Sequence, residues 1–355
     1  MHLVTSVNFG TVYPTSISPM AKVGIIGGGS FGTAMACVLR RGGHDVMLWA
    51  REAEVADAIN RHGTNPHFLP GVALERGIAA TNDLAAAAAE RDFLLMAVPA
   101  QHVRAVAGAL RPSLRRAMPV VSCSKGVERA SCALMPEVLA DMLPGSVVAV
   151  LSGPSFAREI AAGLPCGVVL ACADWSVGES LARHISGRAF CIQLSDDVPG
   201  TALAGAMKNV VSIASGIAHG RGMGDNARAT VVTLGLAEAS RLAIAKGGKA
   251  ATFMGLAGAG DFMLTAHSLQ SRNTSLGVAI GQGRRAAEVL AGRKEVTEGA
   301  QSVEAVAMLA EQLRVEAPLT HALDAILNRD VAVDTAIEEM RKRLPAVCRA
   351  SRVAL

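Results

Sequence analysis

Short apolar runs and amphipathic stretches alternate along the first half of the sequence. Between residue 22 and about residue 173, runs rich in Val, Ile and Leu are separated by Ala-rich stretches whose apolar positions recur with helical spacing. This alternation is typical of βαβ units on a parallel sheet. We therefore expect an α/β domain with a doubly wound parallel sheet, with strands over residues 22–26, 45–49, 93–98, 119–122, 147–151 and 167–172.

The pattern changes after about residue 196. From Pro199 onwards strand-like runs disappear, and long stretches of helical periodicity are separated by glycine-rich turns. The second half is therefore predicted to be an all-α domain. The expected organisation is a disordered leader over residues 1–20, the α/β domain over 21–195, the helical domain over 196–345 and a tail over 346–355.

Length and composition agree with two domains. A chain of 355 residues exceeds the roughly 250–300 residues at which a single core stops growing. Hydrophobic residues make up 51% of the chain and aromatic residues only 3%, so the core must be built mainly from aliphatic side chains. Charges such as Lys208 and Arg158 interrupt every apolar run before it reaches the roughly 18 residues of a membrane-spanning helix. We expect no stable membrane insertion.

Charge and cysteine content exclude further classes. The net charge is +4, and the basic residues are scattered without interleaved aromatics, which disfavours nucleic-acid binding. The seven cysteines show no C-x-x-C spacing, and no His, Cys or Asp cluster has the spacing of metal ligands. Residues 1–19 lack the basic and apolar regions of a signal peptide. These features predict a cytoplasmic protein with reduced thiols and no metal.

A glycine turn follows the first predicted strand of the α/β domain. Gly27, Gly29 and Gly32 have the G-x-G-x-x-G spacing and stand between a buried strand and a predicted helix. In that context the glycines allow a tight turn and close approach of a pyrophosphate, and the helix N-terminus offers N–H donors. The next strand is followed by Arg51 rather than by an acidic residue, so the 2′-phosphate of NADP is at least tolerated.

Other polar residues follow later strands of the same sheet. Lys125 comes directly after a buried strand, where it would hold a nicotinamide or a substrate, although Lys-Gly is also an ordinary surface pair. Gly153 and Ser155 flank Pro154 and would offer a backbone N–H and a hydroxyl to a substrate, or would form only a turn. Ligands in open α/β sheets bind outside the carboxyl ends of the strands, which is where these residues lie.

The helical half contains two candidate sites. Lys208 interrupts a helix of small apolar residues, and desolvation there would lower its pKa and make it a usable acid or base. The alternative is a lysine whose side chain extends into solvent from the one exposed stripe of the helix. Asp261, Ser271, Arg272 and Asn273 lie near predicted helix starts and suit a hydroxylated, phosphorylated ligand. Two N-caps and a solvated arginine would give the same spacing.

Several motifs in a fixed order give the sequence a resemblance to a known family. They are Gly27-Gly-Gly-Ser-Phe-Gly-Thr-Ala34, Leu48-Trp-Ala-Arg51, Ser124-Lys-Gly126, Ser152-Gly-Pro-Ser-Phe-Ala157, Met207-Lys-Asn-Val210, Gly224-Asp-Asn-Ala-Arg228, Gly235-Leu-Ala-Glu238, Thr252-Phe-Met-Gly-Leu-Ala-Gly-Ala-Gly-Asp261 and Ser271-Arg-Asn273. From about residue 21 to residue 344 the chain resembles the bacterial NAD(P)-dependent glycerol-3-phosphate dehydrogenases.

The resemblance implies a Rossmann-type domain and a set of site residues. Besides the glycines of the turn, the residues it implies for the cofactor are Ser30, Phe31, Arg51, Lys125, Ala157, Arg272, Val296 and Glu298. Those it implies for the substrate are Lys125, Gly153, Ser155, Lys208, Asp261, Ser271, Arg272 and Asn273, with Lys208 as the proton-transfer residue. It leaves open whether the protein is a homodimer.

The activity implied by the resemblance is the reduction of dihydroxyacetone phosphate to sn-glycerol 3-phosphate for phospholipid synthesis. NADPH or NADH is the expected cofactor, and Arg51 favours NADPH. The sequence departs from the family pattern at three places, namely at Leu234, at the pair Thr274 and Ser275, and at Thr297. The alternatives are a catalytically silent dinucleotide-binding sensor and a related dehydrogenase that acts on another hydroxyacid or sugar phosphate.

Overall fold

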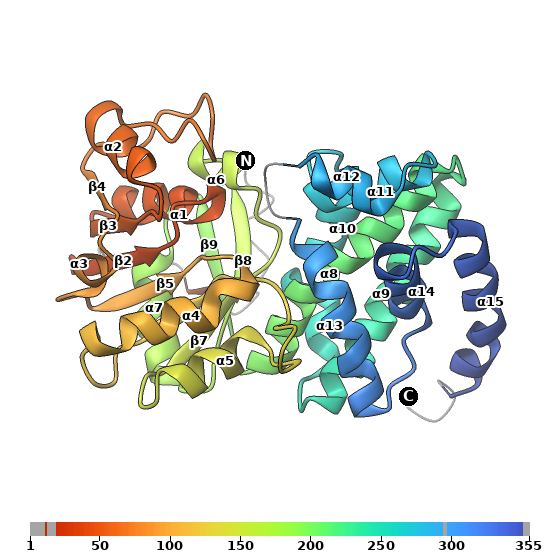
Figure 1. The fold of residues 1–355 in the computed structure, drawn as a ribbon. Helices are drawn as coiled ribbons and strands as arrows, with labels where there is room; N and C mark the ends of the chain where they lie inside the picture. Colours follow the sequence, from red (N-terminus) through yellow and green to blue (C-terminus); the bar gives the residue numbers. More distant parts are fainter. Residues whose placement is uncertain (1–10, 13–18, 294–296, 351–355) are drawn as a thin grey trace. The chain divides into compact units, whose positions relative to one another are not determined.

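The computed structural model describes the backbone of residues 11–12, 19–293 and 297–350, and the side chains of residues 19–293 and 297–343. The chain divides into two compact units. Unit 1 consists of residues 1–124 and 135–201, and unit 2 of residues 125–134 and 202–355. In Figure 1 the strands of unit 1 run from red to yellow-green, and the helices of unit 2 from green to blue. The segment 125–134, which includes Lys125, therefore groups with the helical unit, whereas the sequence placed it in the α/β domain.

Nine strands form one sheet in unit 1, in the order β1-β9-β8-β7-β6-β5-β2-β3-β4. The strands are β1 (Thr11–Val12), β2 (Lys22–Ile26), β3 (Asp45–Trp49), β4 (Ile78–Thr81), β5 (Phe93–Met96), β6 (Val120–Ser122), β7 (Val148–Ser152), β8 (Cys166–Cys172) and β9 (Phe190–Ser195). The six strands from β4 to β7 are mutually parallel, and so are β8 and β9. This confirms the predicted α/β fold with a mostly parallel sheet.

The sheet differs from the expectation because two of its strand pairs are antiparallel. β7 and β8 pair antiparallel, because the chain between them forms only the short helix α6 (Ala157–Ala161) before it returns. β1 pairs antiparallel with β9, so two residues of the expected leader belong to the sheet. The rest of the leader up to residue 18, and the last five residues of the tail, lie outside the described residues. β4 and β9 were not predicted.

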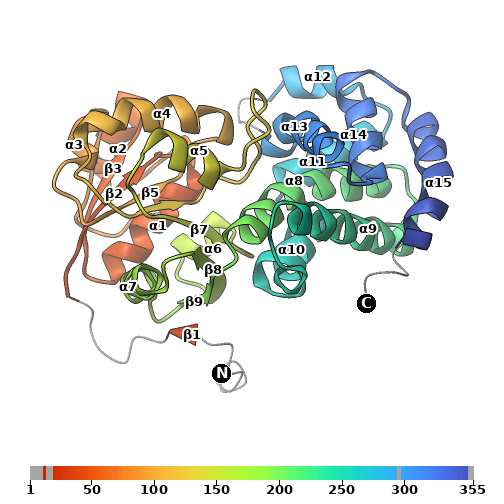
Figure 2. The same cartoon turned by 90° about the horizontal axis from the view of Figure 1, so that it is seen from below.

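Helices cover both faces of this sheet, as Figure 2 shows. One face carries α1 (Ser30–Arg41), α2 (Ala53–His62), α6 and α7 (Trp175–Ile185), whose buried residues share one hydrophobic core cluster with the strands. The other carries α3 (Leu84–Ala88), α4 (Val103–Leu110) and α5 (Met135–Met142), together with the short 3₁₀ segments η1 (Ala100–His102) and η2 (Arg111–Ser113). The doubly wound arrangement places the βα turns at one edge of the sheet.

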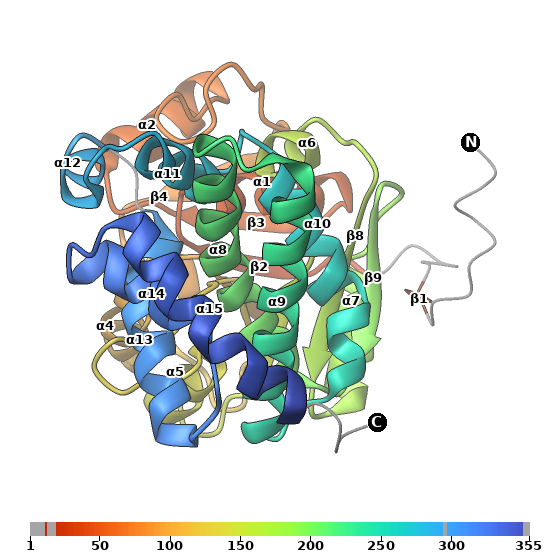
Figure 3. The same cartoon turned by 90° about the vertical axis from the view of Figure 1, so that its right-hand side faces the viewer.

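From residue 202 onwards the described part of unit 2 consists of helices and the turns that join them, whereas its segment 125–134 forms turns closed by a bridge between Val127 and Leu134. Its helices are α8 (Val198–Gly220, from residue 202), α9 (Gly224–Ala245), α10 (Asp261–His267), α11 (Arg272–Gly281), α12 (Ala286–Ala291), α13 (Glu298–Leu313), α14 (Pro318–Asn328) and α15 (Val333–Ala350). A 3₁₀ turn η3 (Ala250–Met254) and a π-helical turn η4 (Leu256–Gly260) precede α10. Figure 3 shows α8 and α9 side by side, with α15 packed on α14.

Glycines allow α8 and α11 to pack with their backbones in close approach. A Cβ at Gly216 would lie 2.2 Å from the Thr274 carbonyl oxygen, and one at Gly277 would lie 2.0 Å from the Ile213 carbonyl oxygen. Only glycine fits at these two positions without moving a helix. Among the described helices, α8 alone is long and apolar enough to cross a membrane, but 89% of its apolar window is buried within the protein, as in a core helix.

A buried carboxylate joins α9 to α14. Glu238 accepts hydrogen bonds from the backbone N–H of Leu319 at 2.6 Å and of Thr320 at 3.1 Å, and from the Thr320 hydroxyl at 2.9 Å. These donors belong to the first turn of α14, which lacks a side-chain cap of its own. Burial raises the pKa of Glu238, and the three hydrogen bonds oppose that effect. Glu238 therefore serves as the cap of α14.

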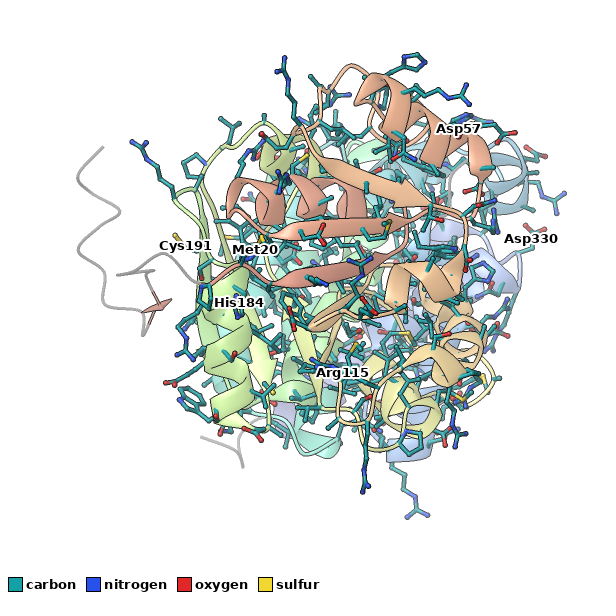
Figure 4. All side chains as sticks on the ribbon, turned by 90° about the vertical axis from the view of Figure 1, so that its left-hand side faces the viewer. Met20, Asp57, Arg115, His184, Cys191 and Asp330 are labelled. Atoms are coloured by element: carbon teal, nitrogen blue, oxygen red, sulfur yellow. The ribbon has the colours of Figure 1, made fainter. Side chains whose placement is uncertain are left out.

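Two histidines pack together in unit 1. His44 Nδ1 accepts a hydrogen bond from the Ala21 N–H at 3.2 Å, so Nε2 carries the proton and donates to the His184 carbonyl at 2.8 Å. The two imidazoles meet edge to face, with ring centroids 5.3 Å apart; His184 lies on α7 and is labelled in Figure 4. Burial lowers the pKa of both residues, and for His184 the nearby His44 adds to the effect.

We expect this pair to make the protein less stable in mild acid. Because the folded-state pKa values are lowered, both imidazoles favour the neutral form when folded, and stability is lost as the pH falls below the ordinary histidine value of about 6.5. Urea unfolding at pH 7.5 and at pH 5.5 should show a smaller pH dependence in His44→Gln than in the unmodified chain. The exposed His62→Gln is the control. An equal reduction in both variants would contradict the assignment.

Candidate active site

The glycine turn has the geometry that a dinucleotide cradle needs. Gly27 follows β2 with a φ of +130°, and a Cβ there would lie 2.6 Å from the Ala97 carbonyl oxygen. A Cβ at Gly32 would lie 2.0 Å from the Gly27 carbonyl oxygen, so α1 can approach the strand only with glycine there. A Cβ at Gly29 would instead meet no atom within 4 Å. Gly29 therefore faces the open space into which a ligand's phosphates can approach the backbone.

The N-terminus of α1 presents donors beside this space. Gly29 is the N-cap residue, no side chain caps the helix, and no acidic residue stands in its first turn. The Ser30 hydroxyl donates to the Phe68 carbonyl at 2.5 Å, and Phe31 is partly buried against the core. Backbone N–H groups and the helix dipole thus favour an anion at this end of α1. These residues fit the pyrophosphate of a dinucleotide.

Asn65 braces the turn and was missed from the sequence. Its side-chain amide donates at 2.8 Å both to the Gly28 carbonyl and to the Thr33 hydroxyl, and its Oδ1 accepts from the Phe68 N–H at 3.1 Å. Asn65 is fully buried. It lies in a loop more than thirty residues beyond the turn, and no local pattern in the sequence indicates that contact.

Arg51 lies after β3, where the sequence analysis expected it, but it has a partner. Its Nε and Nη2 donate to Glu52 Oε1 at 3.0 and 2.6 Å. The Arg51 side chain is 74% exposed and that of Glu52 35% exposed. Glu52 would therefore compete with the 2′-phosphate of a cofactor for the Arg51 guanidinium.

The predicted residues after β7 form a turn. Gly153 has a φ of +143°, and a Cβ there would lie 2.9 Å from Val168 Cα, so a side chain has no room. The Ser155 hydroxyl donates to the Gly153 carbonyl at 2.7 Å. Ala157 is the first residue of α6 and packs against the core of unit 1. Contacts of these three residues with a ligand stay predictions.

Unit 2 brings three of the predicted residues into one charged cluster. Asp261 Oδ1 accepts from Lys208 Nζ at 2.8 Å, and Asp261 Oδ2 accepts from Lys125 Nζ at 2.7 Å. The Asp261 side chain is fully buried, whereas those of Lys208 and Lys125 are 13% and 14% exposed. Lys208 comes from the middle of α8 and Asp261 from the first residue of α10. We call Lys125, Lys208 and Asp261 the lysine–aspartate cluster.

The glycine-rich motif before α10 sets the position of Asp261. A Cβ at Gly258 would lie 2.3 Å from Phe253 Cα and 2.4 Å from its carbonyl oxygen, so η4 folds tightly back on η3. Gly260 then precedes Asp261 at the N-terminus of α10, where no side chain caps the helix. A carboxylate is favoured at this position by the helix dipole.

Burial and charge shift both titrating groups of the cluster. Desolvation lowers the pKa of Lys208 to about 8, with a further lowering by the Lys125 ammonium and an opposing effect of the Asp261 carboxylate. Burial alone would raise the pKa of Asp261, but the two ammonium groups outweigh it and hold that pKa below its usual range. Near neutral pH Lys208 can therefore both give up and take back a proton, while Asp261 stays ionised.

Two residues that the sequence analysis did not single out complete this region. Thr265 accepts a hydrogen bond from Lys208 Nζ at 3.2 Å and donates to Asp261 Oδ1 at 3.2 Å. It lies four residues after Asp261 on α10, and residues at this spacing lie on one face of a helix, so the sequence could have indicated their contact. Asn209 follows Lys208 directly, and its Oδ1 accepts from Asn273 Nδ2 at 2.9 Å.

The residues predicted to hold a phosphate begin α11. Ser271 is the N-cap, and its hydroxyl accepts from the Thr274 N–H at 3.2 Å. Arg272 is the first helical residue and is exposed, whereas Asn273 is buried. Asn273 Oδ1 also accepts from the Gly299 N–H at 3.0 Å, so this side chain links α8 to α13. The side chains of Ser271 and Asn273 are thus held by partners within the chain.

The remaining predictions fall at the start of α13. Glu298 is the first residue of this helix and is half-buried. Val296 lies outside the described residues.

Of the three departures from the family pattern, the one at Thr274 has a structural explanation. Thr274 is fully buried and its hydroxyl donates to the Thr265 carbonyl at 2.8 Å, where a long basic side chain would not fit. Leu234 is half-buried on α9, and Thr297 is the buried N-cap residue of α13.

The described residues contain no group of three or more His, Cys, Asp or Glu side chains that could hold a metal ion. What the cluster offers instead is a lysine of lowered pKa, fixed by a carboxylate and a hydroxyl. Such a group can protonate the oxygen of a carbonyl as electrons arrive at its carbon. The glycine turn of unit 1 offers a site for a dinucleotide.

Comparison with known proteins places this chain in a family. Residues 22–177 match the N-terminal domain of NAD-dependent glycerol-3-phosphate dehydrogenase, and residues 197–338 match its C-terminal domain. Glycerol-3-phosphate dehydrogenase [NAD(P)+] of Caulobacter vibrioides is 49% identical over 322 residues, which cover 91% of this chain and 97% of that one. The enzyme of the same name from Rhodospirillum rubrum is 48% identical over 321 residues, 90% of this chain and 92% of that one.

Solved structures agree with the sequence relatives. The crystal structure of glycerol-3-phosphate dehydrogenase from Coxiella burnetii matches with a TM-score of 0.87 and 35% identity, covering 91% of this chain and 99% of that one. Both domains, the fold and the order of the motifs point the same way. This chain belongs to the glycerol-3-phosphate dehydrogenase family.

Proposed function

We propose that this chain reduces dihydroxyacetone phosphate to sn-glycerol 3-phosphate with NADPH or NADH. The observation that carries the proposal is the lysine–aspartate cluster, in which Lys208 has a pKa near 8 and is held by a fully buried carboxylate. A proton donor poised near neutral pH is what reduction of a ketone requires. The substrate is inferred from the names of the relatives, since each is a glycerol-3-phosphate dehydrogenase [NAD(P)+].

Lys208 is the proton donor in this proposal. NAD(P)H, when bound, supplies the hydride that reaches C2 of the ketone. Lys208 Nζ gives its proton to the C2 oxygen, so that the C=O group becomes CH–OH and the lysine is left neutral. Asp261 and Thr265 hold Nζ in place through the bonds described above. Lys125 adds a second ammonium beside Asp261, where it would bind a substrate oxygen.

The phosphate of the substrate would bind at the start of α11. A phosphate ester carries close to two negative charges at neutral pH. Arg272 offers a guanidinium there, and the first turn of α11 offers backbone N–H groups and a positive dipole end. We place Ser271 and Asn273 in this site as residues that shape it, because their side chains already have partners within the chain. Gly153 and Ser155 are proposed as further substrate contacts.

The cofactor would bind at the glycine turn. Gly27, Gly29 and Gly32 with Ser30 and Phe31 form a cradle that is open at Gly29. Arg51 and Ala157 of unit 1, and Arg272, Val296 and Glu298 of unit 2, complete the set that the family resemblance implies. The product would serve phospholipid synthesis, and we place the enzyme in the cytoplasm because the six described cysteines form no disulfide.

Arg51 and Glu52 should set the choice between the two cofactors. Arg51→Ala removes the cation available to the 2′-phosphate, so the ratio of kcat/KM for NADPH to that for NADH should fall about tenfold. Glu52→Gln should raise the ratio, since it removes the anion that occupies Arg51 and repels a phosphate. Steady-state kinetics with both cofactors measures the ratio. An unchanged ratio in both variants would contradict the role of this pair.

A substrate panel tests the choice of substrate. Dihydroxyacetone phosphate should be reduced far more efficiently than dihydroxyacetone, because only the former can use the charged start of α11. The panel should include a phosphorylated and an unphosphorylated hydroxyacid precursor of similar size. Preference for a 2-oxo acid without a phosphate would instead identify a related dehydrogenase and would refute the proposal.

A further inference from the structure

The motif over residues 224–228 contributes no residue to the site described above. Its last member, Arg228, lies near the start of α9 and is buried. Arg228 Nη1 donates to the Asp225 carboxylate at 3.2 Å, and Nη2 donates to the Ala266 carbonyl oxygen at 3.1 Å. Asp225 is exposed, whereas Ala266 is fully buried in the last turn of α10. A buried guanidinium therefore links α9 to the C-terminal end of α10.

Side chains from three other helices hold this end of α10. The last four carbonyl groups of a helix have no partner within the helix itself. The Ala266 carbonyl accepts from the Ser215 hydroxyl at 2.9 Å as well as from Arg228, and the Thr265 carbonyl accepts from the Thr274 hydroxyl at 2.8 Å. These donors come from α8, α9 and α11. Of the three, Arg228 also brings a positive charge, which a helix C-terminus favours.

α10 carries the two groups that hold Lys208. It is only seven residues long, and a helix this short has little stability of its own. Asp261 and Thr265 both bond to Lys208 Nζ. Ser215 lies seven residues after Lys208 on α8, which is two turns further along the same face, and it bonds to Ala266. A shift of the last turn of α10 would therefore move both partners of Nζ.

We propose that Arg228 is a positioning residue for proton transfer by Lys208. By holding the Ala266 carbonyl, its guanidinium fixes the place of α10, and with it the places of the Asp261 carboxylate and the Thr265 hydroxyl. The inference rests on the proposed function, in which Lys208 gives its proton to the C2 oxygen of the ketone. Arg228 acts through α10 and takes no direct part in the chemistry.

The variant Arg228→Met removes the charge and the donors but keeps most of the length of the side chain. A displacement of about 1 Å at a reacting group costs up to about a hundredfold in rate, so kcat for dihydroxyacetone phosphate should fall about tenfold, with the affinity for NADPH unchanged. The midpoint of the pH profile for reduction should move below 8. The reason is that the Asp261 carboxylate, which raises the pKa of Lys208 against burial and the Lys125 ammonium, is then held less closely to Nζ.

Three further variants separate this role from general packing. Arg228→Lys keeps the charge and should recover part of kcat. Ser215→Ala removes the other donor to the Ala266 carbonyl and should lower kcat in the same direction; combined with Arg228→Met, it should cost more than the product of the two single effects. Arg241→Met is the matched control. Arg241 also lies on α9 and donates from Nη2 to a carbonyl, that of Glu316 at 2.9 Å, so its loss should leave kcat and the pH midpoint unchanged.

Competitive acetylation read by mass spectrometry measures the pKa of Lys208 without turnover. This pKa should be lower in Arg228→Met than in the unmodified chain and in Arg241→Met. A variant Arg228→Met that lowers only Tm, and leaves kcat, the pH midpoint and the pKa of Lys208 in place, would overturn the inference. Equal changes in Arg241→Met, or a loss of NADPH affinity together with kcat, would also overturn it.

Two outcomes need a separate reading. If Arg228→Met yields no folded protein, Arg228→Lys and Ser215→Ala decide, and an unchanged kcat and pKa of Lys208 in both would overturn the inference. An unmodified chain that does not reduce dihydroxyacetone phosphate would refute the proposed function. The acetylation measurement would then still decide whether Arg228 sets the environment of Lys208.

Discussion

Replacing Lys208 with alanine should lower kcat for dihydroxyacetone phosphate reduction by about a thousandfold and leave the affinity for NADPH unchanged. General acid catalysis by a positioned side chain contributes about two to four orders of magnitude. Lys208 Nζ is the group that Asp261 and Thr265 hold with two hydrogen bonds. Steady-state kinetics gives kcat, and a fluorescence titration gives the affinity for NADPH.

The matched control for this variant is Lys342→Ala. Lys342 lies on α15, is exposed and forms an ion pair with Glu339, so its loss should change neither quantity. Survival of most of the turnover in Lys208→Ala would show that another group donates the proton. Loss of cofactor binding in that variant would show that the fold, rather than the chemistry, had been damaged.

The pH dependence follows from the same lysine. Reduction needs the protonated Lys208, whose pKa is about 8, so kcat/KM for the ketone should fall as the pH rises through that value. Oxidation of glycerol 3-phosphate needs the neutral amine, so its rate should rise over the same range.

Replacing Asp261 with asparagine should have the second large effect. The substitution keeps the size of the side chain but removes the buried charge that balances two partly buried ammonium groups. The pKa of Lys208 should then fall further, because the Asp261 carboxylate is the group that raises it. We expect the midpoint of the pH profile for reduction to move below 8, and kcat at pH 7.5 to fall about a hundredfold.

Stability should fall as well. Breaking a buried ion pair by removing one partner costs about 3–5 kcal/mol, since the remaining charges are left uncompensated. Urea unfolding measures this loss, and Asp330→Asn, which breaks the exposed pair with Arg285, serves as the control. A pH profile whose midpoint stays in place in Asp261→Asn would mean that Asp261 does not set the pKa of Lys208.

The sequence predicted every strand of the parallel part of the sheet except β4, and in the mixed part it predicted β8 but neither β1 nor β9. β2, β3 and β5 are apolar runs bounded by turn residues, and this pattern is easily recognised. The sequence of β4 is Ile-Ala-Ala-Thr, which resembles the alanine-rich helical segments near it in the chain and lacks a recognisable strand pattern. β9 is only partly buried and pairs with β8, so its stability comes from a partner that a local pattern does not reveal.

The candidate site shows the same division between local and long-range information. Lys208 could be found because a charge within an apolar helix is costly. Its pairing with Asp261, 53 residues away, and the place of Lys125 in the same cluster depend on how the chain folds.

One assay tests the central claim most directly, namely the stoichiometry between NADPH oxidised and sn-glycerol 3-phosphate formed when the purified protein is given dihydroxyacetone phosphate. The proposal predicts one product molecule for each NADPH consumed, with far slower consumption when the phosphate-free ketone replaces the substrate at the same concentration. A protein that binds NADPH tightly but leaves it unoxidised would contradict the claim and would indicate a dinucleotide-binding sensor instead.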